Sequence, residues 1–216
     1  IGGLRGCQEP QAACSSSPGD DPLYTTGIDI GVALPAGGAT VLVQDNVVQD
    51  LDNSASGVNG LHLRTESSGR AQFTIAGNTV SGLGGEWSTA ALVESRSRET
   101  AVAAIDNDMS ALPGIALGLD VTLNPWGGLD HAAAVEIRGN DLQQFSTGVR
   151  ISNSDLVTTE ALIEANTITA DEVGVYLSTP EGDLSLMEAT VTGNQIDAPT
   201  PVETVGNVIC TGADCP

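Results

Sequence analysis

Hydrophobic and polar residues alternate along most of the chain, and the alternation recurs around an asparagine. In residues 71–80 an alternating apolar run reaches Asn78, and two residues later Val80 points to the same side. Self-similarity at a period of about 30 residues is typical of a solenoid. The pattern surrounds six asparagines, spaced 32, 29, 33, 26 and 28 residues apart: Asn46, Asn78, Asn107 (a degraded copy), Asn140, Asn166 and Asn194.

A second series of alternating runs lies between the asparagines. Alternation with a period of two residues is typical of half-buried strands. Two or three short strands in each unit of about 30 residues, without helical periodicity, predict one turn of a parallel β-helix. The copies of the second series are Gly27-Ile-Asp-Ile, Gly60-Leu-His-Leu, Ala90-Ala-Leu-Val, Gly114-Ile-Ala-Leu, Gly148-Val-Arg-Ile and Gly174-Val-Tyr-Leu.

The asparagine has a physical role at a corner of such a solenoid. Its amide both donates and accepts, so one Asn per coil can bond to its equivalents above and below, about 4.8 Å away. Asn also tolerates the left-handed backbone conformation at a sharp corner. These repeats resemble the right-handed parallel β-helix of the pectin-lyase-like superfamily, and the resemblance covers residues 25–209. The right-handed winding is what the resemblance implies.

The predicted fold is all-β, a single-domain right-handed parallel β-helix of about six coils with an Asn ladder and disulfide-clamped ends. Residues 1–24, rich in Gly, Pro, Ser and Cys, are predicted to form an irregular N-terminal cap. Residues 25–209 form the β-helix, and residues 210–216 form a C-terminal disulfide tail that is too short to cap much. The predicted aliphatic core has two rows: Val43, Ile75, Ile137, Ile163 and Val191, then Val48, Val80, Met109, Leu142, Ile168 and Ile196.

The four cysteines lie near the two ends of the chain. Because the termini of a β-helix lie at opposite ends of the rod, we expect the local pairs Cys7–Cys14 and Cys210–Cys215. Such bonds indicate an oxidising compartment. The chain begins at Ile1 and contains no signal or transmembrane stretch, as expected of a processed, exported protein. We expect an extracellular or cell-surface location; a passenger segment cut from a larger adhesin is a related interpretation.

The charge of the chain narrows the possible partners. The net charge is −21, and every positive side chain is one of seven arginines, because lysine is absent. An acidic surface of this kind repels nucleic acid and anionic lipid, so we expect neither a nucleic-acid partner nor membrane insertion. Polyanions such as pectate would also be repelled unless calcium bridged the two.

Few residues are candidates for binding or chemistry. Trp87 and Trp126 lie in insertions between repeats, where they could stack on a sugar, fill a pocket on another subunit, or fold back as local plugs. His131, in the second insertion, could line the same site. Asp108 and Asp141 each follow a ladder asparagine, so their carboxylates are candidates for a calcium site or for a glycosidase pair about 5 Å apart. Ordinary corner aspartates are the alternative.

Two cross-strand pairs are predicted on the outward faces. Asp29 and His62 occupy matching positions in adjacent copies of the second series, where a solvated contact is favoured over a catalytic dyad. Arg138 and Glu164 match in the same way and predict a surface ion pair.

The resemblance implies polysaccharide chemistry, but its motifs are missing. The outward rows beside the asparagines carry no acidic cluster of the pectate-lyase kind, and the Gly-His-Gly and Arg-Ile-Lys signatures of polygalacturonases are absent. We therefore expect a non-catalytic, exported structural protein without a cofactor, as a surface or matrix component or a filament subunit that stacks end to end. The alternative is a polysaccharide-binding or polysaccharide-cleaving β-helix protein, with a polysaccharide as its partner.

Overall fold

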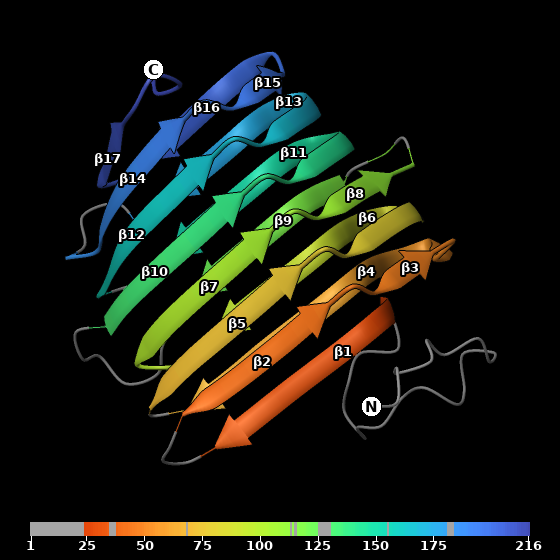
Figure 1. The fold of residues 1–216 in the computed structure, drawn as a ribbon, viewed down its shortest axis with the longest axis horizontal. Helices are drawn as coiled ribbons and strands as arrows, with labels where there is room; N and C mark the ends of the chain where they lie inside the picture. Colours follow the sequence, from red (N-terminus) through yellow and green to blue (C-terminus); the bar gives the residue numbers. More distant parts are fainter. Residues whose placement is uncertain are drawn as a thin grey trace.

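The computed structural model describes residues 24–34, 38–67, 69–112, 114, 116–124, 131–154, 156–180 and 184–216. These residues form strands and no helix, and they wind into a parallel β-solenoid of about five turns. The coils stack in sequence order, from the orange strands β2 and β3 to the blue strands β16 and β17 (Figure 1). The predicted fold is confirmed. The six asparagines mark six corners, which enclose five complete turns, and this explains the difference from the predicted six coils.

Each coil contributes to two sheets, and every strand pair is parallel. One sheet has seven strands in the order β17-β14-β12-β10-β7-β5-β2. Its strands are β2 (Ala39–Gln44), β5 (Arg70–Ala76), β7 (Glu99–Ile105), β10 (His131–Arg138), β12 (Val157–Glu164), β14 (Leu186–Thr192) and β17 (Val208–Thr211).

The other sheet has ten strands, several of them shorter segments of one coil. Its strands are β1 (Tyr24–Leu34), β3 (Val47–Gln49), β4 (Asp52–Ser67), β6 (Thr79–Ser95), β8 (Asp108–Ala111), β9 (Ala116–Leu123), β11 (Asp141–Asn153), β13 (Thr167–Ser178), β15 (Gln195–Asp197) and β16 (Thr200–Val205).

The core lies between the two sheets and follows the predicted rows. In the seven-stranded sheet Val43 aligns with Ile75 and Ile137 with Ile163, and all four are buried. In the ten-stranded sheet Val48 aligns with Val80. Two rings add to this aliphatic core, since Phe73 and Phe145 are among its largest fully buried side chains. Alternation with a period of two therefore decided which side chains the coils enclose.

The left-handed backbone at each ladder corner belongs to the residue before the asparagine, not to the asparagine itself as predicted. The φ angles at these preceding positions lie between 54° and 67°. Glycine and aspartate are common there because they tolerate this region best. The six preceding residues are Asp45, Gly77, Asp106, Gly139, Ala165 and Gly193.

One copy of the second series was aligned wrongly from the sequence. The structure places Gly118 rather than Gly114 at that position, since Leu119 pairs with Val149. A Cβ atom on Gly118 would lie 2.3 Å from the carbonyl oxygen of Gly148, so the close approach of two coils requires a glycine there. The corrected alignment also moves Asp120 onto the outward row that contains Arg150.

Candidate functional site

The six ladder asparagines form one continuous column. The backbone N–H and the Nδ2 of Asn78 both donate to Oδ1 of Asn107, at 2.9 and 3.0 Å. Asn107 donates in the same way to Oδ1 of Asn140, at 3.0 and 2.8 Å. The pair of bonds recurs from Asn46 to Asn78, from Asn140 to Asn166 and from Asn166 to Asn194. All donors therefore point toward the C-terminal end of the column.

Each of the four inner amides in the column uses its full bonding capacity. The second hydrogen of Nδ2 is donated to a carbonyl of the preceding coil: Asn78 to Val43, and Asn140 to Ala104. The four inner asparagines are at most 2 % exposed, so a missing partner would leave polar groups unpaired away from water. An unsatisfied buried group costs about 1–3 kcal/mol. The column therefore fixes the register of the coils.

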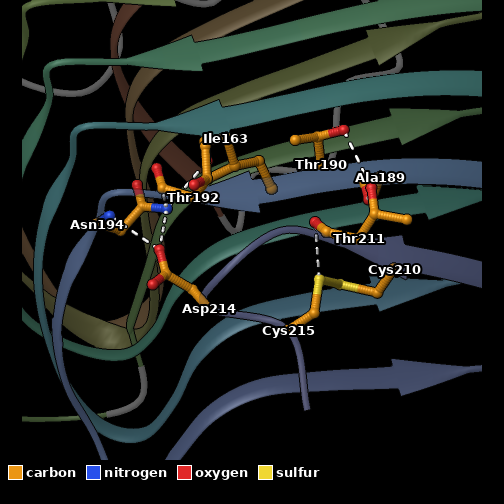
Figure 2. The surroundings of a disulfide bond; sticks show 9 residues. All are labelled: Ile163, Ala189, Thr190, Thr192, Asn194, Cys210, Thr211, Asp214 and Cys215. Atoms are coloured by element: carbon orange, nitrogen blue, oxygen red, sulfur yellow. Dashed lines mark hydrogen bonds between the residues drawn. A yellow bond between two sulfur atoms is a disulfide. The ribbon is translucent and has the colours of Figure 1, made fainter.

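The column ends on a carboxylate rather than on another amide. Oδ2 of Asp214 accepts from the backbone N–H of Asn194 at 2.8 Å and from its Nδ2 at 3.0 Å. Figure 2 shows both bonds beside the Cys210–Cys215 disulfide, which joins the start of the tail to the residue after Asp214. The tail was expected to be too short to cap much. It nevertheless reaches the ladder and closes its last rung.

Several candidates lie outside the described residues. Cys7 and Cys14 belong to residues 1–23, and Trp126 belongs to residues 125–130, so their predicted roles remain predictions. Trp87 lies on β6 with its side chain 57 % exposed. His131 at the start of β10 is buried instead, and its Nδ1 lies 3.2 Å from the carbonyl oxygen of Arg98. Nε2 of His131 is a buried atom without a hydrogen-bond partner.

Asp108 and Asp141 are aligned on adjacent coils, as their spacing from the asparagines predicted. Both are exposed, and Asp141 accepts a hydrogen bond from Nε2 of Gln143. Within the part of the chain that the structure describes, no group of three or more His, Cys, Asp or Glu side chains could hold a metal ion. The two carboxylates could supply only part of a calcium site, since Ca²⁺ takes six to eight oxygen ligands.

The predicted contact between Asp29 and His62 is part of a larger charged cluster on the ten-stranded sheet. Nδ1 of His62 lies 3.7 Å from Oδ1 of Asp29, and its Nε2 lies 2.8 Å from Oε2 of Glu94. Arg64 also bonds to Asp29, at 3.1 Å. The cluster ties together three successive strands, β1, β4 and β6.

This cluster makes one contribution to stability depend on pH. The hydrogen bond from His62 lowers the pKa of Glu94, aided by the charges of His62, Arg96 and Arg64, while partial burial opposes the shift. Because the folded pKa lies below the unfolded value, the contribution is present above the unfolded pKa and is lost as the pH falls through the folded pKa.

A second ion pair on this sheet was missed because of the misaligned repeat. The guanidinium of Arg150 makes two hydrogen bonds to the carboxylate of Asp120, whose residue is only 2 % exposed. That hydrogen bonding raises the pKa of Arg150 further above its usual value, against the effect of partial burial. Aligning Gly118 instead of Gly114 gives a more even coil length, and it would have placed Asp120 and Arg150 on one row. Arg138 and Glu164 pair as predicted, at 3.8 Å.

The outer face of the seven-stranded sheet is hollowed into a shallow groove of about 870 Å³. Small residues form its middle, among them Ala101, Ala103 and Ala134. Glu136, Glu160 and Glu188 also line it, and Glu160 aligns directly with Glu188 on the next coil. The outward rows beside the asparagines begin at Leu162 and Thr190 on these coils, two residues after Glu160 and Glu188, so these two glutamates were missed from the sequence.

Comparison with family models, with curated proteins and with solved structures finds no match to this chain. None of the described residues forms a helix long and apolar enough to cross a membrane.

Proposed function

We propose that the protein is a non-catalytic structural β-helix that works outside the cell as a rigid component of a surface or matrix. The observation that supports this proposal is the closed asparagine column. Six rungs are joined through both backbone and side-chain donors, and the last rung is bonded to Asp214. A column of this kind stabilises one spacing between coils, which suits a spacer or scaffold.

The polar clusters support a structural role over a catalytic one. Asp29 and Glu94 flank His62, and Asp120 binds Arg150 in two places. In each cluster the charges pair with charges on neighbouring coils, so these side chains contribute to holding coils together. Catalytic residues are more often displaced from their usual pKa by burial inside a cleft.

The disulfide and the surface charge support the location. Disulfides persist in oxidising compartments and are rare in the cytosol, and Cys210–Cys215 is formed here. A net charge of −21 favours solubility of an exposed rod at high concentration.

The test combines location with activity. Protein recovered from its own source should lie in the extracellular or surface fraction with Cys210 and Cys215 bonded, as measured by mass spectrometry after thiol alkylation. Purified protein should release no product from a panel of neutral and acidic polysaccharides. Free thiols at these positions in the native material, or turnover of any polysaccharide, would overturn the proposal.

A polysaccharide-binding role is a second candidate, and the groove on the seven-stranded sheet favours it. Its alanine-lined middle leaves room for a chain lying along the rod, and its three glutamates would repel polyuronates. A neutral polysaccharide is therefore the expected ligand. Glu160→Ala should change its affinity measurably in calorimetry, whereas Glu203→Ala on the opposite sheet should not. If both variants bind the polysaccharide as tightly as the wild type, the groove is not its binding site.

A further inference from the structure

The C-terminal tail occupies the position of a seventh rung. After β17 the chain turns at Gly212, and the backbone N–H of Asp214 donates to the carbonyl of Val191 at 3.2 Å. Asp214 then accepts both donors of Asn194 through a single oxygen, as each asparagine does for its predecessor. β17 therefore covers the edge of β14, and the tail that continues from it covers the end of the ladder (Figure 2).

A carboxylate at this position ends the ladder. An ionised carboxylate accepts hydrogen bonds and has no hydrogen to donate, so Asp214 cannot pass the pattern to a further rung. All ladder donors point toward this end, so a negative charge there is electrostatically favourable. Hydrogen bonds to an ionised acceptor are also roughly twice as strong as neutral ones.

Two features hold the tail in place. The disulfide links Cys210, which aligns with Ala189 of β14, to Cys215, so Asp214 lies inside a closed loop. Gly212 is the second feature. Its φ is +113°, and a Cβ atom there would lie 2.2 Å from the carbonyl oxygen of Val191. A larger residue would push the tail away from the coil beneath it.

We propose that this tail is a releasable cap, and that the coil face beneath it binds a second copy of this chain. When β17 and the tail are released together, the face presents the two donors of Asn194 and the edge of β14. At the other end of the column Asn46 carries the matching acceptor, since its Oδ1 receives no hydrogen bond from the described residues. β2, the edge strand at that end, pairs only with β5 among the described strands.

The described parts of the two ends are therefore complementary, with donors at one and an acceptor at the other; the predicted N-terminal cap lies almost entirely outside the described residues. A contact between unlike ends does not close on itself, and it propagates into a row of molecules. Pairing of exposed strand edges adds backbone hydrogen bonds to such a contact. In the capped form both donors of Asn194 are already bonded to Asp214, so they are not available for this contact.

Reduction of the disulfide is the release step. A thiolate of a dithiol reductant attacks one sulfur of Cys210–Cys215, the S–S bond breaks, and a mixed disulfide forms. The second thiol of the reductant then attacks the mixed disulfide and displaces the protein cysteine that it contains. In total, two electrons and two protons pass from the dithiol to the protein, which gains two thiols, and the reductant leaves as a cyclic disulfide.

This inference is independent of the proposed function, because a ligand-binding or catalytic β-helix could carry the same cap. The experiment compares the oxidised full chain with the full-chain double variant Cys210→Ser and Cys215→Ser, which leaves Cys7 and Cys14 intact. Hydrogen exchange at the backbone amide of Asn194 measures release of the cap. Light scattering over a range of concentrations measures assembly.

The oxidised wild type should be monomeric and protected at Asn194. In the double variant that amide should exchange about tenfold faster or more, as expected of a locally opened end, and the molar mass should rise with concentration. Gly212→Ala should have the same two effects with both cysteines present. Asp197→Ala, which removes an exposed carboxylate from the same coil, should behave as the wild type.

Any one of three results overturns the proposal. Unchanged exchange at Asn194 would show that the disulfide does not hold the cap. Fast exchange in a protein that stays monomeric would show that the uncovered face binds no second copy. If the double variant fails to fold, the wild type reduced with a dithiol carries the same expectations. Assembly of the oxidised wild type would overturn the proposal as well.

Discussion

Two corners connect the sheets in each coil, and their buried polar side chains are hydrogen-bonded in different ways. The ladder corner, which leads from the seven-stranded to the ten-stranded sheet, uses one asparagine per coil and the same pair of bonds at every step. The opposite corner uses mixed pairs of buried hydroxyls and amides. We call it the hydroxyl corner, and its buried polar side chains include Thr65, Ser95, Ser97, Thr100, His131, Asn153, Thr159, Thr179 and Ser185.

Bonds at the hydroxyl corner differ from coil to coil, and they include both local pairs and pairs between coils. Oγ of Ser95 lies 2.7 Å from Oγ1 of Thr100, and Thr159 donates to Oδ1 of Asn153 at 3.0 Å. These two pairs lie five and six residues apart in the chain, but Oγ1 of Thr65 also lies 2.9 Å from Oγ of Ser97, 32 residues away on the next coil. Only the ladder corner repeats the same pair of bonds at every step, between residues 26 to 33 apart. The ladder corner therefore fixes one stacking of the coils, while the less regular hydroxyl corner can accept insertions of different length.

Removing one rung should have the largest effect and would test the comparison most directly. Asn140→Ala removes the acceptor for both donors of Asn107 and opens the column in its middle. Two buried donors without partners should lower the free energy of unfolding by about 4 kcal/mol, measured by urea denaturation. Asn124→Ala, at an exposed asparagine, should cost less than about 0.5 kcal/mol. Equal losses would contradict the special role of the ladder.

A hydroxyl pair should matter less than a rung. Thr159→Val keeps the shape of a side chain that is 0 % exposed but removes its bond to Asn153. We expect a loss of about 1 kcal/mol in the same denaturation experiment, because one local bond is affected. The control is Thr158→Val on the exposed face of the same strand, which should be nearly neutral. A loss as large as that of Asn140→Ala would show that both corners stabilise the stacking equally.

The ladder corner also contains Ala165, a residue whose replacement should stabilise the protein. Ala165 precedes Asn166 with φ of 55°, while the equivalent residues on both adjacent coils are Gly139 and Gly193. The left-handed region costs an alanine roughly 1–2 kcal/mol, and the extra entropy loss of a glycine offsets part of that gain. Ala165→Gly should therefore stabilise the protein by up to about 1 kcal/mol in thermal denaturation. Ala161→Gly within β12 is the control and should destabilise it; a loss in both variants would refute the assignment of strain.

The smallest effect is expected at the buried histidine of the hydroxyl corner. Nε2 of His131 has no hydrogen-bond partner among the described residues, so His131→Leu removes an unsatisfied polar atom, together with the contact between Nδ1 and the carbonyl of Arg98. We expect unchanged stability or a gain of less than about 1 kcal/mol in thermal denaturation. A loss of more than about 2 kcal/mol would mean that Nε2 makes an important bond, and the hydroxyl corner would then be as specific as the ladder.

The sequence by itself determined the strands, the asparagine column and both rows of the core. These features depend on a period-two alternation and on one residue type repeated once per coil, so each unit carries its own signal. The pairs Asp108 with Asp141 and Asp29 with His62 followed from the same spacing. The Cys210–Cys215 bond followed from the position of the two termini at opposite ends of the rod, which left only local pairs.

Only the tertiary structure decided the features that join unlike segments. Asp214 becomes a rung although nothing in the repeat resembles it, because the tail turns at Gly212 and reaches the column from outside the pattern. The pair of Asp120 and Arg150 depended on which of two glycines approaches the next coil. Repetition encodes contacts between equivalent positions, whereas a cap or an irregular corner depends on the path of the backbone in space.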